Sequence, residues 1–413
     1  MSVDDAGLLA CLGPVLTGAP LGLAVSGGGD SMAMLHLAVR AGADRGLLHV
    51  VTVDHGLRAE SADEARFVGR VCAGLGVAHV TLRWTGWDGQ GNTADQARRA
   101  RYGLMADWAR ATGIGRIALA HTRDDQAETF LMRLARKAGV DGLAAMAPCR
   151  VAHGIAWLRP LLGVGRADLR RYLSGAGLPW IDDPGNDDLR HDRVKARAAL
   201  AVLDPLGIGA GTLAEVARNL AVARQALDEA TRAAARRCCR VDGGDVVFDR
   251  TLFGELPAEI RRRLMERALR WVASAEYGPR AAALAGFVAA ACGRQPMTLH
   301  GCRLLPGTSA FRICREVQAV KHLATPADKL WDGRWQFSGA DSNGLQVRAL
   351  GACGLAQLPD WRGAGRPRAA LLAAPALWRN DTVVAAPLAG RVQGWHLQVK
   401  PDAEGLFLSA LSH

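Results

Sequence analysis

The sequence predicts an α/β fold: a parallel, doubly wound sheet, followed by a helical domain and a small strand-rich C-terminal domain. Through residues 1–205, short apolar runs alternate with helical stretches, as is typical of a parallel sheet covered by helices on both faces. From about Thr212 the chain is rich in alanine and arginine, and after Gln295 short strand-like segments are punctuated by glycine and proline. We therefore predict domains at 1–205, 206–294 and 295–413.

Each element of the first domain is identified by its apolar pattern and its turn residues. Apolar runs predict strands at 21–25, 47–53, 79–82 and 116–120, and helical stretches are predicted at 31–40, 93–108 and 124–137. The segment Thr93-x-x-Gln96 has the spacing of a helix-capping box. Because ligands bind beyond the carboxyl ends of the strands in such sheets, we expect the site in the turns from strand to helix.

The two later domains are predicted from composition and from fewer elements. Helices are expected at 213–237 and 257–272, and strands at 312–314, 345–347 and 382–384. The sequence shows no internal repeat and no low-complexity tract.

The length, composition and charge of the chain restrict the classes of protein to which it can belong. With 413 residues the chain exceeds what one hydrophobic core usually organises, and 49% hydrophobic with 22% charged residues is typical of a globular protein. The 51 basic residues outnumber the 40 acidic ones, giving a net charge of +11. Such a surplus favours a polyanionic partner such as nucleic acid, although compositional drift explains it equally well.

Targeting and cysteine patterns point to the cytoplasm. The first five residues are acidic and lack the basic start of a signal peptide, and no apolar run reaches the ~18 residues of a membrane span. None of the nine cysteines forms a Cys-x-x-Cys pair. We therefore expect free thiols in a reducing compartment, and neither a zinc nor an iron–sulfur site.

The first turn with chemical content is Ser-Gly-Gly-Gly-Asp-Ser at residues 26–31, between a strand and a helix. Three glycines allow the backbone N–H groups to approach a ligand closely, and the start of the following helix adds its positive end. We predict that this loop binds phosphate, although a tight turn with capping serines would have the same residues. It is not a Walker A loop, because no Gly-Lys-Ser/Thr follows, and Asp30 excludes the dinucleotide fingerprint.

Two further turns carry polar residues at the same edge of the predicted sheet. Asp54-His55-Gly56 follows the second strand, where an isolated Asp-His pair is more often an ordinary surface turn. After the fourth strand, residues 120–129 contain His121 and several acids, and Asp125 and Glu128 are three residues apart and share a helix face. The helix dipole would favour one such acid in a first turn by itself.

The loop at 26–31 resembles the pyrophosphate loop of the N-type ATP pyrophosphatases, also called the PP-loop superfamily. Those enzymes cleave ATP between the α and β phosphates and adenylate an oxygen. The loop alone leaves open the NAD, GMP, asparagine and argininosuccinate synthetases and the tRNA thiolation enzymes. The thiolation enzymes carry cysteine pairs that this chain lacks.

The order of the motifs narrows the resemblance to one family, the tRNA(Ile)-lysidine synthetases. The matching segments are the loop at 26–31, then 54–58, 97–102, 120–129, 159–162 and 180–184, with Asn186 close behind. Two departures stand out: Gly185 where the family usually has serine, and Val194 where it usually has asparagine. The arginines at 193 and 197 are kept, although a solvated basic helix face would also place them there.

The resemblance implies an adenine nucleotide alpha hydrolase-like fold and a two-step ligation. Wobble cytidine of the CAU-anticodon isoleucine tRNA is adenylated by ATP, with Mg²⁺, and L-lysine then displaces AMP to give lysidine. The implied catalytic residues are Asp30, His121, Asp125 and Glu128, with Asp30 also the metal ligand; those for ATP are Ser26, Gly27, Gly28, Gly29, Asp30, Ser31 and His55. Those for lysine are Arg101, Asp125 and Glu128, and those for tRNA are Arg98, Arg166, Arg193, Lys195 and Arg197.

Two other interpretations stay open from the residues alone. A PP-loop enzyme could adenylate a different tRNA base or a small molecule, with the basic surplus incidental. Alternatively, the chain could bind RNA on a catalytically inactive scaffold, which the intact loop and the paired acids argue against. We expect no membrane association, and no protein partner beyond a second copy of the chain in a homodimer.

Overall fold

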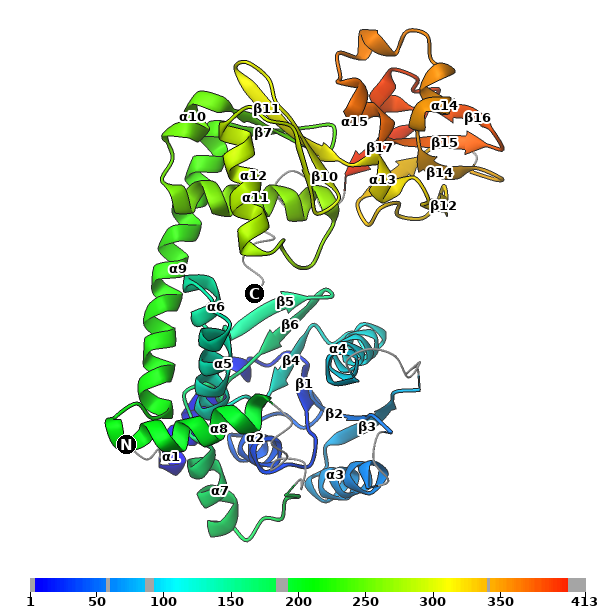
Figure 1. Ribbon diagram of the computed structural model, residues 1–413. Coiled ribbons are helices and arrows are strands. Elements are labelled where there is room, and N and C mark those ends of the chain that lie inside the picture. The colour runs from blue at the N-terminus through cyan, green and yellow to red at the C-terminus, as the bar shows by residue number, and fades with distance from the viewer. Residues whose placement is uncertain (1–3, 57–59, 86–92, 183–191, 340–341, 400–413) are drawn as a thin grey trace. The chain divides into compact units, whose positions relative to one another are not determined.

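The computed structural model of the chain describes residues 4–56, 60–85, 93–182, 192–339 and 342–399, apart from the side chains of 93–95 (Figure 1). The chain forms two compact units, Met1–Gln225 and Ala226–Leu411. The long helix α9, Ala210–Cys238, begins in the first unit and ends in the second.

The first unit is built on a six-stranded sheet with the order β3-β2-β1-β4-β6-β5. Its strands are β1 (Leu21–Ala24), β2 (Leu48–Asp54), β3 (Ala78–Arg83), β4 (Arg116–Leu119), β5 (Cys149–Ala152) and β6 (Ile155–Leu158). The first five strands in this order, β3-β2-β1-β4-β6, pair in parallel with their neighbours. The edge strand β5 pairs antiparallel to β6. The predicted parallel sheet is confirmed, whereas the hairpin of β5 and β6 was not foreseen.

Helices cover both faces of this sheet. They are α1 (Asp5–Leu12), α2 (Gly29–Arg40), α3 (Ser61–Leu75), α4 (Thr93–Ala111), α5 (Arg123–Ala135), α6 (Val140–Leu143), α7 (Arg166–Gly175) and α8 (Asp192–Leu203), with short 3-10 turns at Gly13–Val15 and Asp204–Leu206. The predicted helices 31–40, 93–108 and 124–137 correspond to α2, α4 and α5, and their ends lie within three residues of the predicted ones. The expected capping box at Thr93 lies outside the described side chains.

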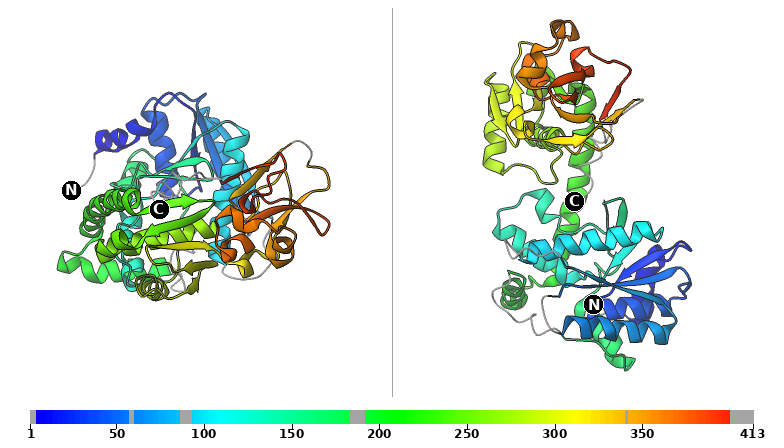
Figure 2. Two further views of the ribbon diagram at one scale, coloured as in Figure 1. Left: turned by 90° about the horizontal axis from the view of Figure 1, so that it is seen from above. Right: turned by 90° about the vertical axis from the view of Figure 1, so that its right-hand side faces the viewer.

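Two hydrophobic cores lie on opposite faces of the sheet because neighbouring side chains of a strand point in opposite directions. Val50 of β2 packs in one core with α2, α3 and α7, whereas Val51 packs in the other core with Met105 of α4. Figure 2 (right) shows α3 and α4 on opposite sides of the strands. The strand order reverses between β1 and β4, so the turns after these two strands meet at the edge where doubly wound folds bind ligands.

The second unit begins with an antiparallel sheet packed on helices. Its strand order is β7-β8-β11-β10-β9, formed by β7 (Cys239–Asp242), β8 (Asp245–Asp249), β9 (Met297–Leu299), β10 (Cys302–Leu305) and β11 (Ala310–Arg315). The helices are α10 (Arg250–Glu255), α11 (Ala258–Ala273) and α12 (Ala281–Cys292). This sheet draws strands from both sides of residue 295. The division into three domains at 205 and 294 stays a prediction.

The remainder of the second unit is strand-rich, as expected from its glycine and proline content. A four-stranded sheet contains β12 (Ala324–Pro326), β14 (Gln346–Ala349), β15 (Pro375–Arg379) and β16 (Thr382–Ala385), and β13 (Trp335–Ser338) pairs with β17 (His396–Val399). Short helices α13 (Val317–Val320), α14 (Gly351–Ala356) and α15 (Arg368–Leu372) and 3-10 turns at Trp361–Ala364 and Pro387–Ala389 connect these strands.

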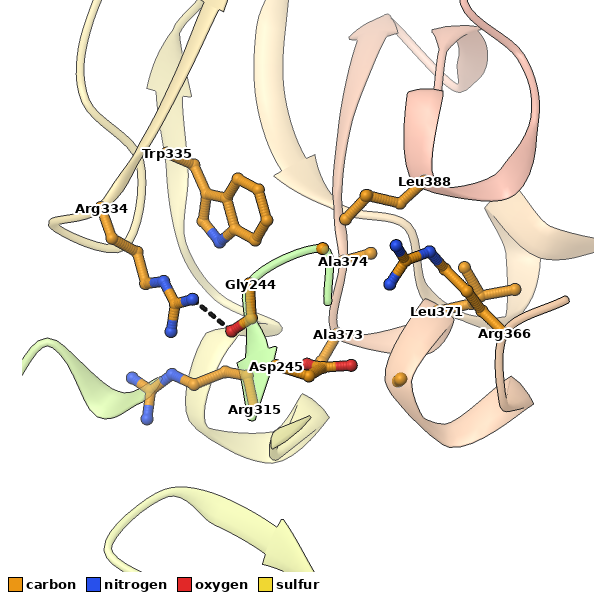
Figure 3. Close-up of a pocket in the computed structure, with 12 residues that line it drawn as sticks. Gly244, Asp245, Arg315, Arg334, Trp335, Arg366, Leu371, Ala373, Ala374 and Leu388 are labelled. Atoms are coloured by element: carbon orange, nitrogen blue, oxygen red, sulfur yellow. Dashed lines mark hydrogen bonds between the residues drawn. The ribbon is translucent and has the colours of Figure 1, made fainter. Parts of the chain in front are cut away.

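A buried arginine joins the turn between β7 and β8 to the strand-rich part of the same unit (Figure 3). Arg334 donates hydrogen bonds to the backbone carbonyls of Trp271, Val272 and Gly244, and its guanidinium lies 4.3 Å from the ring centre of Trp271 and 5.3 Å from that of Trp335. Burial lowers the pKa of Arg334 to about 10. Gly244 has φ +78° and lies directly against Trp335, so this turn requires glycine.

No single helix among the described residues has both the length and the apolar character needed to cross a membrane. The bent pair Asp192–Leu206 and Ala210–Cys238 satisfies the length and composition requirements only when its two members, 98° apart, are taken together.

Candidate active site

The loop at 26–31 forms the turn between β1 and α2, and a hydrogen-bond network fixes its shape. Gly27 has φ +93°, a conformation that glycine adopts without strain, and Gly28 is the N-cap residue of α2. The Ser31 hydroxyl donates to the carbonyl of Gly28 at 2.9 Å and accepts from the backbone N–H of Ser26 at 3.1 Å. Ser31 is therefore a buried brace of the loop, whereas Ser26 is exposed at the sheet edge.

A segment far along the chain, around Ile181, contacts this loop and supports it. The N–H of Ile181 donates to the carbonyl of Gly27 at 3.0 Å, and Gly28 forms a parallel bridge with Ile181. A side chain at Gly29 would lie 3.5 Å from the Trp180 ring. Trp180 and Ile181, from one of the segments that contributed to the family resemblance, therefore hold the loop at 26–31 in shape. Asp183 to Arg190, with the departure at Gly185, lie outside the described residues.

The acids predicted from the sequence converge on one arginine. Nε, Nη1 and Nη2 of Arg166 lie 3.2 Å from Asp30, 3.2 Å from Glu128 and 3.3 Å from Asp125, respectively. The backbone N–H of Arg166 also donates to Asp124 at 2.7 Å. Arg166, which we had assigned to tRNA, thus contacts the carboxylates of the phosphate loop and of α5 in this structure.

The two carboxylate oxygens of Asp125 have different partners: one caps helix α5, and the other faces Arg166. Its Oδ2 accepts from the N–H of Thr122 at 2.8 Å and from the Thr122 hydroxyl at 2.9 Å, which forms a capping box at the start of α5. Its Oδ1 faces Arg166. Burial by itself would raise the pKa of Asp125, but the backbone hydrogen bond from Thr122 and the charge of Arg166 outweigh it, and the pKa lies below its usual value.

Glu128 is the most deeply buried acid of the site, with no exposed surface. Its Oε1 accepts from Arg166 at 3.2 Å and from Nε of Arg197 at 2.7 Å. Its Oε2 is buried and has no hydrogen-bond partner within the described part of the chain. Because an unpaired buried carboxylate oxygen is costly, this atom can accept a hydrogen bond from a donor outside the described residues, such as water or a ligand.

Asp30 lies in the first turn of α2, where its carboxylate faces the same cluster. Burial raises the pKa of Asp30 to about 6, although the charge of Arg166 offsets part of that effect. Within the described ranges, no three Asp, Glu, His or Cys side chains are arranged as a complete metal site. One carboxylate beside a phosphate loop nevertheless fits Mg²⁺, because protein-bound Mg²⁺ is usually held by one or two carboxylates together with substrate phosphates.

His121 is held in one tautomer. Arg159 donates from Nε to Nδ1 of His121 at 3.2 Å, and because arginine has no acceptor, the proton of the neutral imidazole must lie on Nε2. Burial lowers the pKa of His121 to about 3. In this state His121 offers a hydrogen-bond donor and is a poor proton acceptor.

His55, after β2, is paired with a basic residue from α4. Nε of Arg101 donates to Nε2 of His55 at 3.1 Å. The rings of His55 and Trp84 pack edge-to-face, with their centres 6.0 Å apart. Burial and the nearby Arg101 lower the pKa of His55 to about 4. His55 and Arg101, predicted for ATP and lysine respectively, therefore contact each other. Arg58 lies outside the described residues.

The residues predicted to bind tRNA have different surroundings. Arg98 is exposed, 5.5 Å above the Tyr102 ring, and Lys195 is exposed, 4.0 Å from Asp192. Arg193 is half-buried, and its positive charge contributes to lowering the pKa of His121 and of Asp125. Arg197 instead pairs with Glu128.

Sequence reasoning missed three contributors to the site. Arg159 belongs to a motif that we quoted without a role, Thr122 caps α5 through a Thr-x-x-Asp spacing, and Trp180 supports the loop. Only the Thr-x-x-Asp spacing was readable in advance, because the other contacts join segments far apart in the chain.

Comparison with known proteins bears on the family to which the chain belongs. A family model described as a PP-loop domain matches residues 8–203. The tRNA(Ile)-lysidine synthase of Ruegeria pomeroyi is 52% identical over 395 residues, which cover 95% of this chain and 94% of that protein. Proteins of the same name from Wolbachia pipientis and a Bradyrhizobium species are 34% and 45% identical, over 79% and 60% of this chain and 78% and 73% of their own lengths.

The first of these relatives matches nearly the whole chain and not the PP-loop domain alone. An enzyme of another PP-loop family is therefore not favoured. The order of motifs, the sheet with its phosphate loop and this similarity agree, and the chain belongs to the tRNA(Ile)-lysidine synthase family.

Proposed function

We propose that this chain uses ATP to activate the wobble cytidine of the CAU-anticodon isoleucine tRNA and joins L-lysine to its C2, giving lysidine, AMP and pyrophosphate. The relatives named above are tRNA(Ile)-lysidine synthases. The observation that carries the proposal is the cluster of Asp30, Asp125 and Glu128 beside the phosphate loop. Such a cluster suits the binding of cations, here Mg²⁺ on the ATP phosphates and the ammonium groups of lysine.

In the first step, the C2 carbonyl oxygen of the cytosine attacks the α-phosphate of ATP, and pyrophosphate leaves. The backbone N–H groups at the start of α2 and the exposed Ser26 hydroxyl would hold the departing phosphates. Mg²⁺ held by Asp30 would neutralise charge on the phosphate oxygens. The Nε2–H of His121 is available as a donor to an oxygen that gains negative charge.

In the second step, an amine of lysine attacks C2, the new C–N bond forms, and the C2–O bond to AMP breaks. Asp125 and Glu128 are the acidic partners for the two ammonium groups of lysine. The attacking amine must first lose a proton, and the unpaired Oε2 of Glu128 or Oδ1 of Asp125 fits this role better than His121, whose acceptor nitrogen is taken by Arg159. Arg101 is proposed for the lysine carboxylate.

The anticodon loop suits such a site because its unpaired bases can be turned out of the stack. Arg98, Arg193 and Lys195 are the proposed contacts to its phosphates, and the parts of the chain after residue 205 would contact the rest of the tRNA. A cytoplasmic location and a homodimer stay predictions from the sequence.

The test is incubation of the full-length protein with total tRNA, ATP and labelled L-lysine. Label in a single isoleucine tRNA, dependent on ATP, is the expected result. Release of pyrophosphate that requires a small molecule and no RNA would instead support the small-molecule alternative. ATP turnover of any kind would exclude a protein that only binds RNA.

A further inference from the structure

The guanidinium of Arg166 occupies the position where the proposed reaction needs Mg²⁺ and the ammonium groups of lysine. The guanidinium of Arg166 directs its three nitrogens at three different carboxylates, those of Asp30, Asp125 and Glu128, at 3.2 to 3.3 Å. The side chain is only 21% exposed, so these contacts are largely shielded from water. The three acids raise the pKa of Arg166 against the opposing effect of its burial, so the guanidinium stays charged.

The same three carboxylates are those that the proposed function assigns to Mg²⁺ and to the ammonium groups of lysine. Arg166 and a cationic substrate therefore compete for them, because two cations at one partly buried site repel each other strongly. Glu128 illustrates the crowding: its Oε1 accepts from Arg166 and Arg197, while its Oε2 has no partner in the part of the chain that the structure describes.

The backbone of Arg166 is anchored independently of its side chain. Its N–H donates to Asp124 at 2.7 Å, and the N–H of Arg123 donates to the carbonyl of Val164 at 2.9 Å, so the start of α7 is tied to the start of α5. The side chain can therefore change partners while the helix stays in place. The phosphates that the adjacent loop is proposed to bind are the obvious new partner, since arginine binds phosphate in a bidentate manner.

We propose that Arg166 is a positioning residue that occupies the cation site of Asp30, Asp125 and Glu128 in the free enzyme and moves to the phosphates of the bound nucleotide. This rests on the proposed function. Lysine then binds weakly to the free enzyme and tightly once nucleotide has drawn Arg166 away. Nucleotide and lysine binding are coupled through one side chain, and the coupling is reciprocal.

The experiment measures the Kd of L-lysine by titration calorimetry, with and without a non-hydrolysable ATP analogue and Mg²⁺. For the wild type, nucleotide should tighten lysine binding about tenfold or more. For Arg166→Gln, lysine binding without nucleotide should be about tenfold tighter than for the wild type, and nucleotide should change it little. A residue that only holds the fold would give the opposite sign, weaker lysine binding in the variant.

Two further variants keep the test decisive. Arg166→Lys retains the charge but loses the three-way fork, so its lysine affinity without nucleotide should lie between those of the wild type and Arg166→Gln. Arg110→Ala removes an exposed arginine that pairs with Asp107 in the last turn of α4, and it should behave as the wild type does. Wild-type lysine affinity that does not respond to nucleotide, or a glutamine variant with no gain, would overturn the proposal.

Lysine transfer to tRNA by the wild type, measured in parallel, separates the two levels of inference. Transfer without coupling means that the proposed function holds and the role of Arg166 is wrong. Absence of both transfer and lysine binding means that the proposed function itself is wrong, and the role of Arg166 with it.

Discussion

Arg197 of α8 donates from Nε to Oε1 of Glu128 at 2.7 Å, joining two helices whose contacting residues are 69 positions apart in the chain. Glu128 has no exposed surface, and a buried carboxylate is tolerated only when its charge is matched. In this structure Arg197 is therefore first of all a counterion of the active-site acid. One arginine of the basic stretch predicted to bind tRNA therefore contacts an acid of the candidate site.

The first prediction concerns Glu128→Gln. The amide keeps the shape of the side chain but removes the charge that we assign to a lysine ammonium group, so the KM for lysine should rise by about tenfold or more while the KM for ATP changes by less than about threefold. Steady-state kinetics with each substrate varied in turn provide the measurement. Equal increases for both substrates would assign Glu128 to the nucleotide or the metal.

The second prediction concerns Asp30→Asn. If Asp30 holds Mg²⁺ on the phosphates, pyrophosphate release should fall by about 10²-fold or more, whereas the Kd for tRNA should stay within about twofold. Asp107→Asn, on the outer surface of α4, is the control and should retain full activity. Pyrophosphate release close to that of the wild type would remove Asp30 from the site.

The third prediction is a pH dependence of stability. The folded-state pKa of Asp30, about 6, lies above the value of about 3.9 expected in the unfolded chain, so the folded state holds this proton more tightly. The free energy of unfolding should therefore fall by about 2 kcal/mol as pH rises from 4 to 6 and then level off, in the wild type relative to Asp30→Asn. Urea unfolding across this range is the measurement. A wild type that gains stability with rising pH would mean that Arg166 outweighs the burial.

The fourth prediction concerns the glycine turn at Arg334. Gly244→Ala forces φ +78° on an L-residue and drives its Cβ into Trp335, so it should destabilise the second unit by about 1–3 kcal/mol. Gly254→Ala in α10 is the matched control: nothing lies near its added methyl group, and alanine favours helix, so stability should stay equal or rise. Thermal denaturation of both variants makes the comparison, and equal midpoints would show that the turn tolerates a side chain.

The fold of the first unit could be predicted from the sequence because each strand, helix and turn is marked by residues close together in the chain. Strands such as β1 and β2 are short apolar runs bounded by turn residues, and the loop at 26–31 has a composition that few other structures require. The hairpin of β7 and β8 has a local signal as well, since Gly243-Gly244 separates two short segments that contain valine, but the charged residues of β7 and the neighbouring alanine-rich helix made that signal weak.

The arrangement of charges within the site was not accessible in the same way. Arg166 and Arg197 lie 38 and 69 residues from Glu128, and a basic residue in a sequence looks the same whether it faces solvent or a buried acid. The burial of Glu128 is a property of the packed fold, and only burial creates the need for these counterions. Sequence reasoning therefore identified these acids as candidates but could not predict which arginines contact them.

The last prediction separates the two kinds of basic residue on α8. Lys195 is exposed and only loosely paired with Asp192, so it is free to contact an RNA phosphate, whereas Arg197 pairs with Glu128. Each neutralised phosphate contributes about −0.7 to the slope of log K against log salt for a single strand. Lys195→Ala should therefore weaken tRNA binding and make this slope shallower by about 0.7, with little change in the KM for lysine. Arg197→Ala should leave this slope unchanged and lower the free energy of unfolding, because it leaves the buried Glu128 without its closest counterion. Filter binding of tRNA at several salt concentrations, with Arg110→Ala as the control, measures the slopes. A Lys195→Ala slope equal to that of the control would assign this face of α8 to solvent.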